Sequence, residues 1–205
     1  MAVNPPSTST PAIQASAATN EPSTPVADES TDTDNADTLA VEPPPPPETP
    51  AAKAAPFLAD AKKAHDDGRD ADAIKAYWKA LALDETPADT WLALAQAYFD
   101  NKQYSEAAST SQEAIRRAPE NPAYTVFYLQ VVKAAQPVSR YQSELNAAYE
   151  KFPADADIAF ALADSFKDSG DTHDAALVYT DFIQRNPTDP RRPDAEAALS
   201  DLIAK

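Results

Sequence analysis

Cysteine is absent from this 205-residue sequence, so the chain can form no disulfide and offers no thiolate ligand or cysteine nucleophile. Glycine occurs only at Gly68 and Gly170, which leaves no glycine-rich loop to hold a phosphate group. The residue spacings typical of zinc hydrolases, serine hydrolases and calcium-binding loops are also missing. We therefore expect a protein that is not an enzyme and that binds no cofactor and no metal.

Positive charge is scarce: 17 Lys and Arg stand against 33 Asp and Glu, for a formal net charge of −16. The longest basic clusters are three pairs, Lys62-Lys63, Arg116-Arg117 and Arg191-Arg192. Such a chain would repel a nucleic-acid backbone more than attract it. No window approaches the roughly 18 consecutive apolar residues of a membrane-spanning helix, and the N-terminus lacks the features of an export signal. We expect a soluble, cytoplasmic protein with no membrane insertion and no nucleic-acid partner.

Aromatic residues are missing from the first quarter of the chain, since all of them lie from Phe57 to Phe182. Residues 1–53 instead hold eleven of the twenty prolines and eight acidic residues against the single base Lys53. This composition cannot bury enough apolar surface to offset the loss of chain entropy. We predict a disordered, acidic, Pro/Ser/Thr-rich tail over residues 1–53 and a folded domain over residues 54–205.

Five consecutive prolines, residues 43–47, lie near the end of the predicted tail. Such a run favours polyproline II, which extends by about 3.1 Å per residue. It is either a ligand for a proline-binding groove or a solvated spacer. No basic residue flanks the run, as many such grooves require, so the spacer is the favoured interpretation.

A 34-residue pattern organises the remaining chain and is clearest in residues 88–121. Its marker residues at positions 4, 7, 8, 11, 20, 27 and 32 are Trp91, Leu94, Ala95, Tyr98, Ala107, Ala114 and Pro119. Small residues at positions 8 and 20 let two antiparallel helices cross closely, and proline at position 32 ends the second helix. This unit resembles the tetratricopeptide repeat.

The same frame recurs in residues 54–87, 122–155 and 156–189, so the resemblance covers four repeats. It implies an all-α fold, a right-handed α-solenoid of helix-turn-helix repeats. Residues 190–205 have helical apolar spacing but no second helix after them, and we interpret them as a C-terminal capping helix.

The third repeat, residues 122–155, departs from the pattern. Leu129 replaces alanine at position 8, and Tyr141 replaces alanine at position 20. Both changes put bulk where the two helices of a repeat usually touch. Either this helix pair splays apart or the neighbouring repeats adjust.

In the family that these repeats resemble, the first helix of each repeat lines a concave groove. The matching positions here form a mixed surface with aromatic and aliphatic side chains. They are Leu58, Lys62, Leu92, Gln96, Phe99, Val126, Phe127, Gln130, Lys133, Phe160, Asp164 and Lys167. The resemblance therefore implies a non-catalytic adaptor or scaffold that holds a protein or peptide partner through this groove.

Some chaperone-binding members of the family grip a C-terminal carboxylate with lysine, asparagine and arginine side chains. The matching residues here are Leu58, Lys62, Gln96, Ala123 and Phe127. We therefore expect no binding of a chaperone C-terminal tail. The alternative to a cytoplasmic adaptor is an envelope-associated structural or assembly protein, periplasmic or at the cell surface, in which the tail is a spacer. The sequence defines neither the partner nor the oligomeric state.

Each of the two histidines, His65 and His173, is followed by an aspartate. They fall at helix ends in different repeats, so we interpret both as solvated helix-end residues rather than as parts of a catalytic site.

Overall fold

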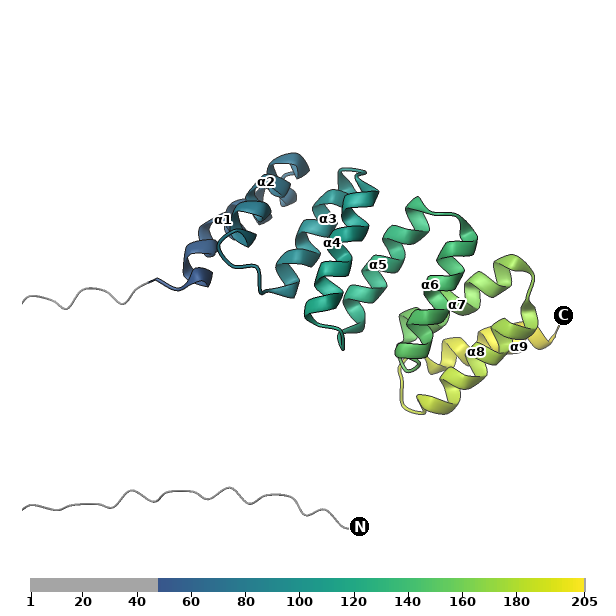
Figure 1. The fold of residues 1–205 in the computed structure, drawn as a ribbon. Coiled ribbons are helices and arrows are strands. Elements are labelled where there is room, and N and C mark those ends of the chain that lie inside the picture. The colour runs from purple at the N-terminus through teal and green to yellow at the C-terminus, as the bar shows by residue number, and fades with distance from the viewer. Residues whose placement is uncertain (1–47, 205) are drawn as a thin grey trace, which may run out of the picture. The chain divides into compact units, whose positions relative to one another are not determined.

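The computed structural model describes residues 48–204, which fold as helices without a strand (Figure 1). The predicted disorder of the tail and the conformation of the proline run at residues 43–47 fall outside these described residues. The helices are α1 (Pro50–Asp66), α2 (Asp70–Leu81), α3 (Ala88–Asp100), α4 (Tyr104–Arg117), α5 (Pro122–Ala135), α6 (Val138–Lys151), α7 (Ala156–Ser169), α8 (Thr172–Arg185) and α9 (Arg192–Ile203). None of the helices in this part is long and apolar enough to cross a membrane.

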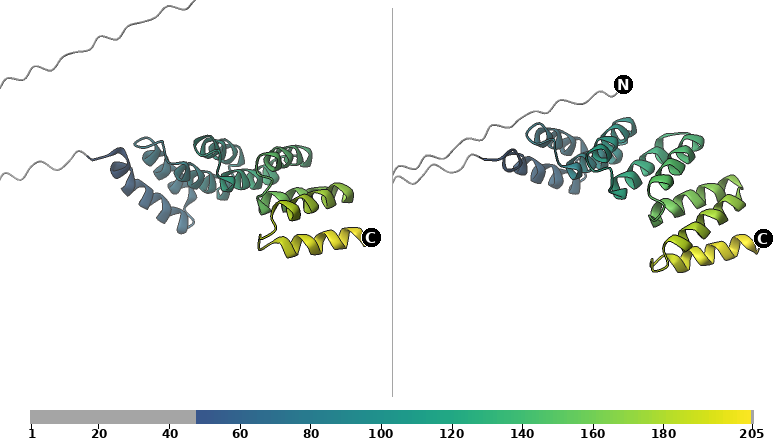
Figure 2. Two further views of the ribbon diagram at one scale, coloured as in Figure 1. Left: turned by 90° about the horizontal axis from the view of Figure 1, so that it is seen from below. Right: turned by 60° about the horizontal axis from the view of Figure 1, so that its bottom comes forward.

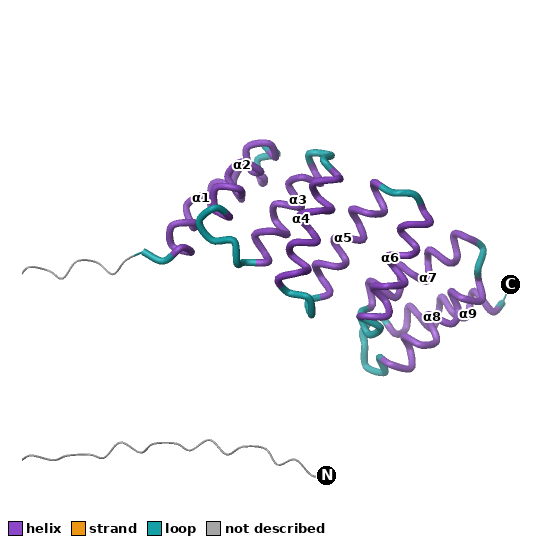
Figure 3. Tube along the Cα trace, in the orientation of Figure 1, coloured by secondary structure: helices purple, strands orange, loops and turns teal. Residues whose placement is uncertain are grey.

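The helices follow one another in chain order, each packed against its neighbours in sequence (Figure 2). Pairs α1–α2, α3–α4 and α7–α8 are the two helices of the first, second and fourth repeats, and α9 packs on α8 at the end of the array. Short loops join them throughout (Figure 3). The structure thus confirms an all-α helical-repeat solenoid.

Alanine at positions 8 and 20 explains the close packing within three of the repeats. These alanines have 0 % exposure in every case: Ala61, Ala73, Ala95, Ala107, Ala163 and Ala175. A larger side chain at any of them would push the two helices apart.

Left-handed backbone ends the first helix in three repeats. Gly68 follows α1 with φ of 72° and Gly170 follows α7 with φ of 88°, a conformation that glycine adopts without steric cost. Lys102 adopts φ of 60° after α3, where a side chain costs roughly 1–2 kcal/mol. The loop after α3 therefore makes the same turn at a higher cost in backbone conformational free energy.

The first helix begins upstream of the predicted domain start at residue 54. The Thr49 side chain accepts a hydrogen bond from the backbone nitrogen of Ala52 at 3.1 Å, and Pro50 occupies the first turn. A capping threonine followed by proline is a strong helix-start signal that average composition does not detect. Residues 50–53 are therefore helical, although the first buried residue is Ala54.

The third repeat is the splayed one. Helix α5 packs less closely on α6 than the two helices of the other repeats do, and α6 also packs loosely on α7. Only Leu145 and Ala148 of α6 are buried, while Tyr141 is half-buried. Of the two alternatives left open by the bulky residues, the structure shows the separated helix pair.

The core is correspondingly divided into two clusters of buried side chains. One cluster runs from α1 to the start of α5 and ends at Tyr124. The other begins at Leu129 of the same helix and extends to Ala195 of α9. Helix α5 therefore belongs to both.

Candidate partner-binding groove

A hollow opens between α5 and α7 where the third repeat is splayed. It consists of two adjoining cavities of about 310 and 570 Å³ that share Lys133, Tyr141 and Ala161. We call it the α5–α7 groove, and its other principal residues are Val126, Leu129, Gln130, Asp157, Asp164 and Asp168. Helices α5 and α7 form its walls, and Tyr141 of α6 forms part of its floor.

The two walls carry opposite charges. On the α5 side, the Lys133 ammonium lies 5.7 Å from the centre of the Tyr141 ring, within range of a cation–π attraction. On the α7 side, Asp164 accepts from Lys167 at 3.0 Å, whereas Asp168 makes no ion pair with any described residue. The groove therefore presents an apolar middle between a cation and carboxylates.

The Tyr141 hydroxyl stays protonated at neutral pH. Burial raises the pKa of Tyr141, and the negative charge of Asp164 raises it further. The same two causes raise the pKa of Tyr179, behind Asp164, to about 12, and its hydroxyl donates to the Asp164 carboxylate at 3.3 Å. The floor of the groove is thus an uncharged phenol that can both donate and accept a hydrogen bond.

Four of the twelve residues predicted for a partner groove lie in this hollow. Val126, Gln130, Lys133 and Asp164 line the α5–α7 groove itself. None of the twelve predicted residues is buried; the half-buried ones are Leu58, Leu92, Gln96, Phe99, Val126, Phe127 and Phe160, and the exposed ones are Lys62, Gln130, Lys133, Asp164 and Lys167.

An aromatic contact joins the α3 and α5 parts of the predicted groove. The rings of Phe99 and Phe127 meet edge to face, with centres 5.9 Å apart and planes at 70°. On α1, Lys62 lies beside Asp66, with 3.6 Å between ammonium and carboxylate. The structure therefore brings Phe99 and Phe127 together but leaves Lys62 as a solvated helix-surface pair.

Phe160 differs from Phe127 in its surroundings. Its ring packs against Tyr179 and Phe182 of α8 at centre distances of 5.3 and 5.7 Å. The guanidinium carbon of Arg191, just before α9, lies 4.0 Å from the ring centre. Phe160 therefore holds α7, α8 and the start of α9 together, and its use as a partner anchor stays a prediction.

Tyr141, Ala161 and Asp168 line the groove but were not among the predicted residues. Position 20 of a repeat normally points into the helix pair, so Tyr141 is not expected at a surface. The size of Tyr141 could have predicted this exposure, because a tyrosine cannot fit where six alanines at the matching packing positions are fully buried.

One histidine has partners that the sequence did not reveal. His65 is half-buried, with Nδ1 2.9 Å from Asp70 and Nε2 3.7 Å from Asp100. One ligand atom from each of the three side chains lies within 4.8 Å of the others. Because a carboxylate faces each ring nitrogen, we assign the ring a structural role between α1, α2 and α3. The solvated interpretation fits His173, which is exposed, but it is wrong for His65.

Comparisons with known proteins agree with this architecture. Residues 64–125 match the family model of the tetratricopeptide repeat. A tetratricopeptide repeat protein from Parabacteroides merdae ATCC 43184 is similar in structure with a TM-score of 0.59 at 10% identity, covering 74% of this chain and 60% of that one. MamA has a TM-score of 0.54 at 16% identity, with coverage of 74% and 86%. YrrB, described as a TPR protein with an unusual peptide-binding site, has a TM-score of 0.52 at 21% identity, with coverage of 74% and 76%. No curated protein matches the sequence.

Paired helices on a 34-residue period, without a strand in the described part, define a helical-repeat protein. The match to the repeat model identifies residues 64–125 as tetratricopeptide repeats. The described helical array as a whole shares the fold of solved tetratricopeptide-repeat proteins.

Proposed function

We propose that this protein is a non-catalytic adaptor or scaffold that holds a protein or peptide partner along the face formed by α1, α3, α5 and α7. The α5–α7 groove is the observation that carries the proposal, because it is open, partly apolar and bordered by both charges. Repeat arrays of this kind typically bind partners through extended surfaces of this sort, without catalysis or cofactor. The description of YrrB as a peptide-binding TPR protein is consistent with this role.

The chemistry of the groove favours an extended or helical peptide segment. An apolar side chain of the partner would contact Val126 and the Tyr141 ring, while its backbone carbonyls or a carboxylate would meet Lys133. Amide groups or a basic side chain would meet Asp164 and Asp168 on the opposite wall. The cavity volumes lie in the range that holds a few side chains, rather than a folded domain.

A chaperone C-terminal tail does not fit this surface. The five positions that would grip its carboxylate hold Leu58, Lys62, Gln96, Ala123 and Phe127. Phe127 is engaged with Phe99, and Lys62 is the only cation of the set. We therefore propose a partner recognised by apolar anchors and amide hydrogen bonds instead.

Affinity capture followed by calorimetry tests the proposal. A partner recovered with the wild-type protein is titrated against Lys133→Glu, in which the cationic wall becomes acidic, and against Lys75→Glu on α2. Lys75 is an exposed lysine outside the groove, so it controls for the change in charge. We expect Lys133→Glu to lose at least about tenfold in affinity and Lys75→Glu to bind normally. Equal binding by both variants would place the partner elsewhere.

We also propose that the adaptor acts in the cytoplasm. An envelope-associated assembly protein would use the same groove, with residues 1–53 as a spacer. Fractionation of the source cells with an antibody to the repeat domain distinguishes the two locations. Recovery in the periplasmic or surface fraction would replace the cytoplasmic proposal without affecting the groove.

A further inference from the structure

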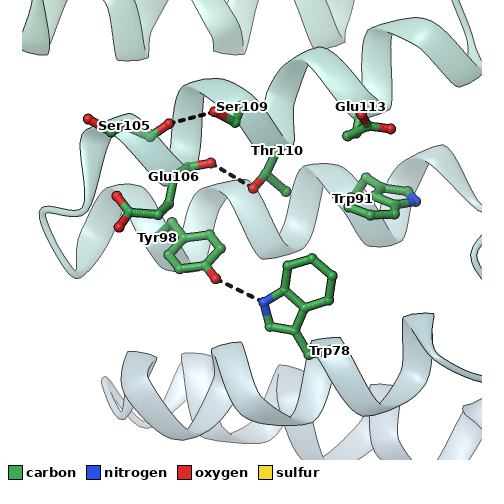
Figure 4. A pocket seen from close by; sticks show the side chains of 8 residues that line it. All are labelled: Trp78, Trp91, Tyr98, Ser105, Glu106, Ser109, Thr110 and Glu113. Atoms are coloured by element: carbon green, nitrogen blue, oxygen red, sulfur yellow. Dashed lines mark hydrogen bonds between the residues drawn. The ribbon is translucent and has the colours of Figure 1, made fainter.

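A second pocket is formed by α2, α3 and α4. It has a volume of about 440 Å³ and is lined by Trp78, Trp91, Tyr98, Ser105, Glu106, Ser109, Thr110 and Glu113. We call it the α2–α4 pocket. The second helices α2 and α4 contribute to it together with the first helix α3, whereas the walls of the α5–α7 groove come from two first helices. Figure 4 shows the two indoles and Tyr98 between the helices.

The aromatic residues of this pocket are held in place by contacts with each other. Trp78 is 45% exposed, yet its indole nitrogen donates to the Tyr98 hydroxyl at 2.8 Å (Figure 4). The rings of Trp78 and Trp91 meet edge to face, with centres 5.7 Å apart. Trp91 in turn donates to the backbone oxygen of Glu85 at 2.9 Å and lies under the Arg117 guanidinium. A ligand would therefore meet a preformed aromatic surface and would not have to order these side chains.

Two of the three hydroxyls on the α4 wall already donate to backbone carbonyls of their own helix. The Ser109 hydroxyl donates to the Ser105 carbonyl at 3.0 Å, and the Thr110 hydroxyl donates to the Glu106 carbonyl at 2.6 Å. Both hydroxyls are therefore satisfied within their own helix. The Tyr98 hydroxyl keeps a proton to donate, because it accepts from Trp78. Such a surface suits stacked rings and a single accepted hydrogen bond.

The charge at the edge of the pocket is negative. Glu106 is exposed and forms no ion pair among the described residues, while Glu113 pairs with Arg116 and Arg117. Within residues 48–204, no lysine or arginine is among the residues that line the pocket. A ligand that complements it must bring its own positive charge next to an apolar, ring-shaped group.

We propose that the α2–α4 pocket binds a proline-rich segment of a partner protein in the polyproline II conformation, with a lysine or arginine beside the prolines. Proline rings stack on exposed indole and phenol rings, and the preformed helix loses little entropy on binding. A proline carbonyl accepts from the Tyr98 hydroxyl, and the basic side chain pairs with Glu106. The site is independent of the partner proposed for the α5–α7 groove.

The chain's own proline run is a poor occupant by the same argument. Residues 43–47 lie between Glu42 and Glu48 in a segment that carries eight acidic residues and one base. Docking this run would bring carboxylates against Glu106, while the neighbouring cations Arg116 and Arg117 already pair with Glu113. Charge therefore selects a basic partner and disfavours self-binding.

Intrinsic fluorescence gives a direct test, because the chain contains only two tryptophans and both line this pocket. The full-length protein is titrated with three synthetic peptides: six prolines flanked by arginines, six prolines flanked by glutamates, and a Gly/Ser peptide flanked by arginines. We expect saturable fluorescence change with the first peptide alone, weakened by added salt. No response to it up to millimolar concentration, or an equal response to the Gly/Ser peptide, would overturn the proposal.

Substitutions in the pocket test where the peptide binds. Binding is then measured by calorimetry, because the Trp78 variants remove one of the two fluorophores. We expect Trp78→Ala to weaken the arginine-flanked peptide by about tenfold or more, and Trp78→Phe to retain much of the affinity. Glu106→Gln should reduce the preference for arginine over glutamate flanks. The control is Leu177→Ala on α8, which removes another exposed apolar side chain away from the pocket. Binding unchanged in Trp78→Ala would overturn the proposal.

Two other occupants are separate outcomes of these measurements. A second copy of the chain would make the tryptophan signal depend on protein concentration and would appear as a dimer in sedimentation. If the chain's own proline run occupied the pocket, it would compete with the added peptide. Changing residues 43–47 to alanine would then make the peptide bind more tightly. Either result would replace the basic proline-rich partner.

Discussion

In the second repeat, Ala95 and Ala107 meet at the crossing of α3 and α4 and are fully buried, whereas the third repeat has Leu129 and Tyr141 at the same two positions. The second repeat is closely packed, and the pocket beside it is formed by α2, α3 and α4, where Trp78 is exposed and Tyr98 is half-buried. The third is splayed, and its groove opens between first helices. Bulky residues at these two packing positions thus accompany an open groove in the third repeat, and alanines accompany a closed helix pair in the second.

The largest expected effect on stability comes from exchanging alanine and tyrosine at position 20 of the second and third repeats. Ala107→Tyr should destabilise the protein by about 3 kcal/mol, because the ring has no space between α3 and α4. Tyr141→Ala should cost less, about 1 kcal/mol, because it removes only a half-buried ring. Urea unfolding followed by circular dichroism measures both. Ala147→Tyr, at an exposed position of α6, is the control. Equal costs for the two exchanges would show that the two repeats do not differ in packing.

Glutamate substitutions at the two phenylalanines predicted for the partner groove should also differ in their cost to stability. Phe160→Glu should cost about 2 kcal/mol, because the ring packs on Tyr179 and Phe182 beneath Arg191. Phe127→Glu should change stability by less than about 1 kcal/mol but abolish binding of the captured partner. Thermal unfolding measures the stability of each variant, and calorimetric titration of the same samples measures its binding of the partner. If Phe127→Glu unfolds the protein, that ring is core and does not belong to the partner-binding face.

The smallest expected effect concerns the link between the splayed repeat and the next one. The Tyr149 hydroxyl of α6 donates to the Asp181 carboxylate of α8 at 2.6 Å, so Tyr149→Phe should cost about 1 kcal/mol at pH 7. Hydrogen bonds from Arg185 and Tyr149 hold the pKa of Asp181 below its ordinary value of 3.8.

A depressed carboxyl pKa means that the contribution of Asp181 is complete above the unfolded-state value and is lost as the pH falls through the folded-state value. The difference in unfolding free energy between wild type and Tyr149→Phe should therefore be constant from pH 7 to about 5 and shrink below about pH 4. Unfolding curves at pH 7, 5 and 3 measure it. A difference that grows on acidification would contradict the assigned hydrogen bond.

The repeat frame was predictable because its signals are local. Alanines at positions 8 and 20, and Gly68 and Gly170 after first helices, each act through a neighbouring turn or an adjacent helix. The splay of the third repeat was predictable only as one of two outcomes, since bulk at Tyr141 can be accommodated by either side. The start of α1 at Pro50 was missed because composition was averaged across a helix cap.

The site residues were harder to predict because their exposure depends on more than one helix. Position in the repeat marked Phe127 and Phe160 alike, but Arg191 covers only Phe160, and its position depends on the loop before α9. Trp78 falls outside the groove positions of the family, and its pocket forms only when Tyr98 of α3 and the small residues of α4 pack beside it. The partners of His65 come from two further helices.

The division of the core within α5 has a consequence for unfolding. In a repeat array, cooperativity passes only between neighbouring units, so a loosely packed junction is where it is weakest. Both tryptophans belong to the α1–α4 side of that junction, while helical circular dichroism reports on the whole array. We expect the two spectroscopic melting curves not to coincide, with fluorescence following one half of the array and ellipticity both halves.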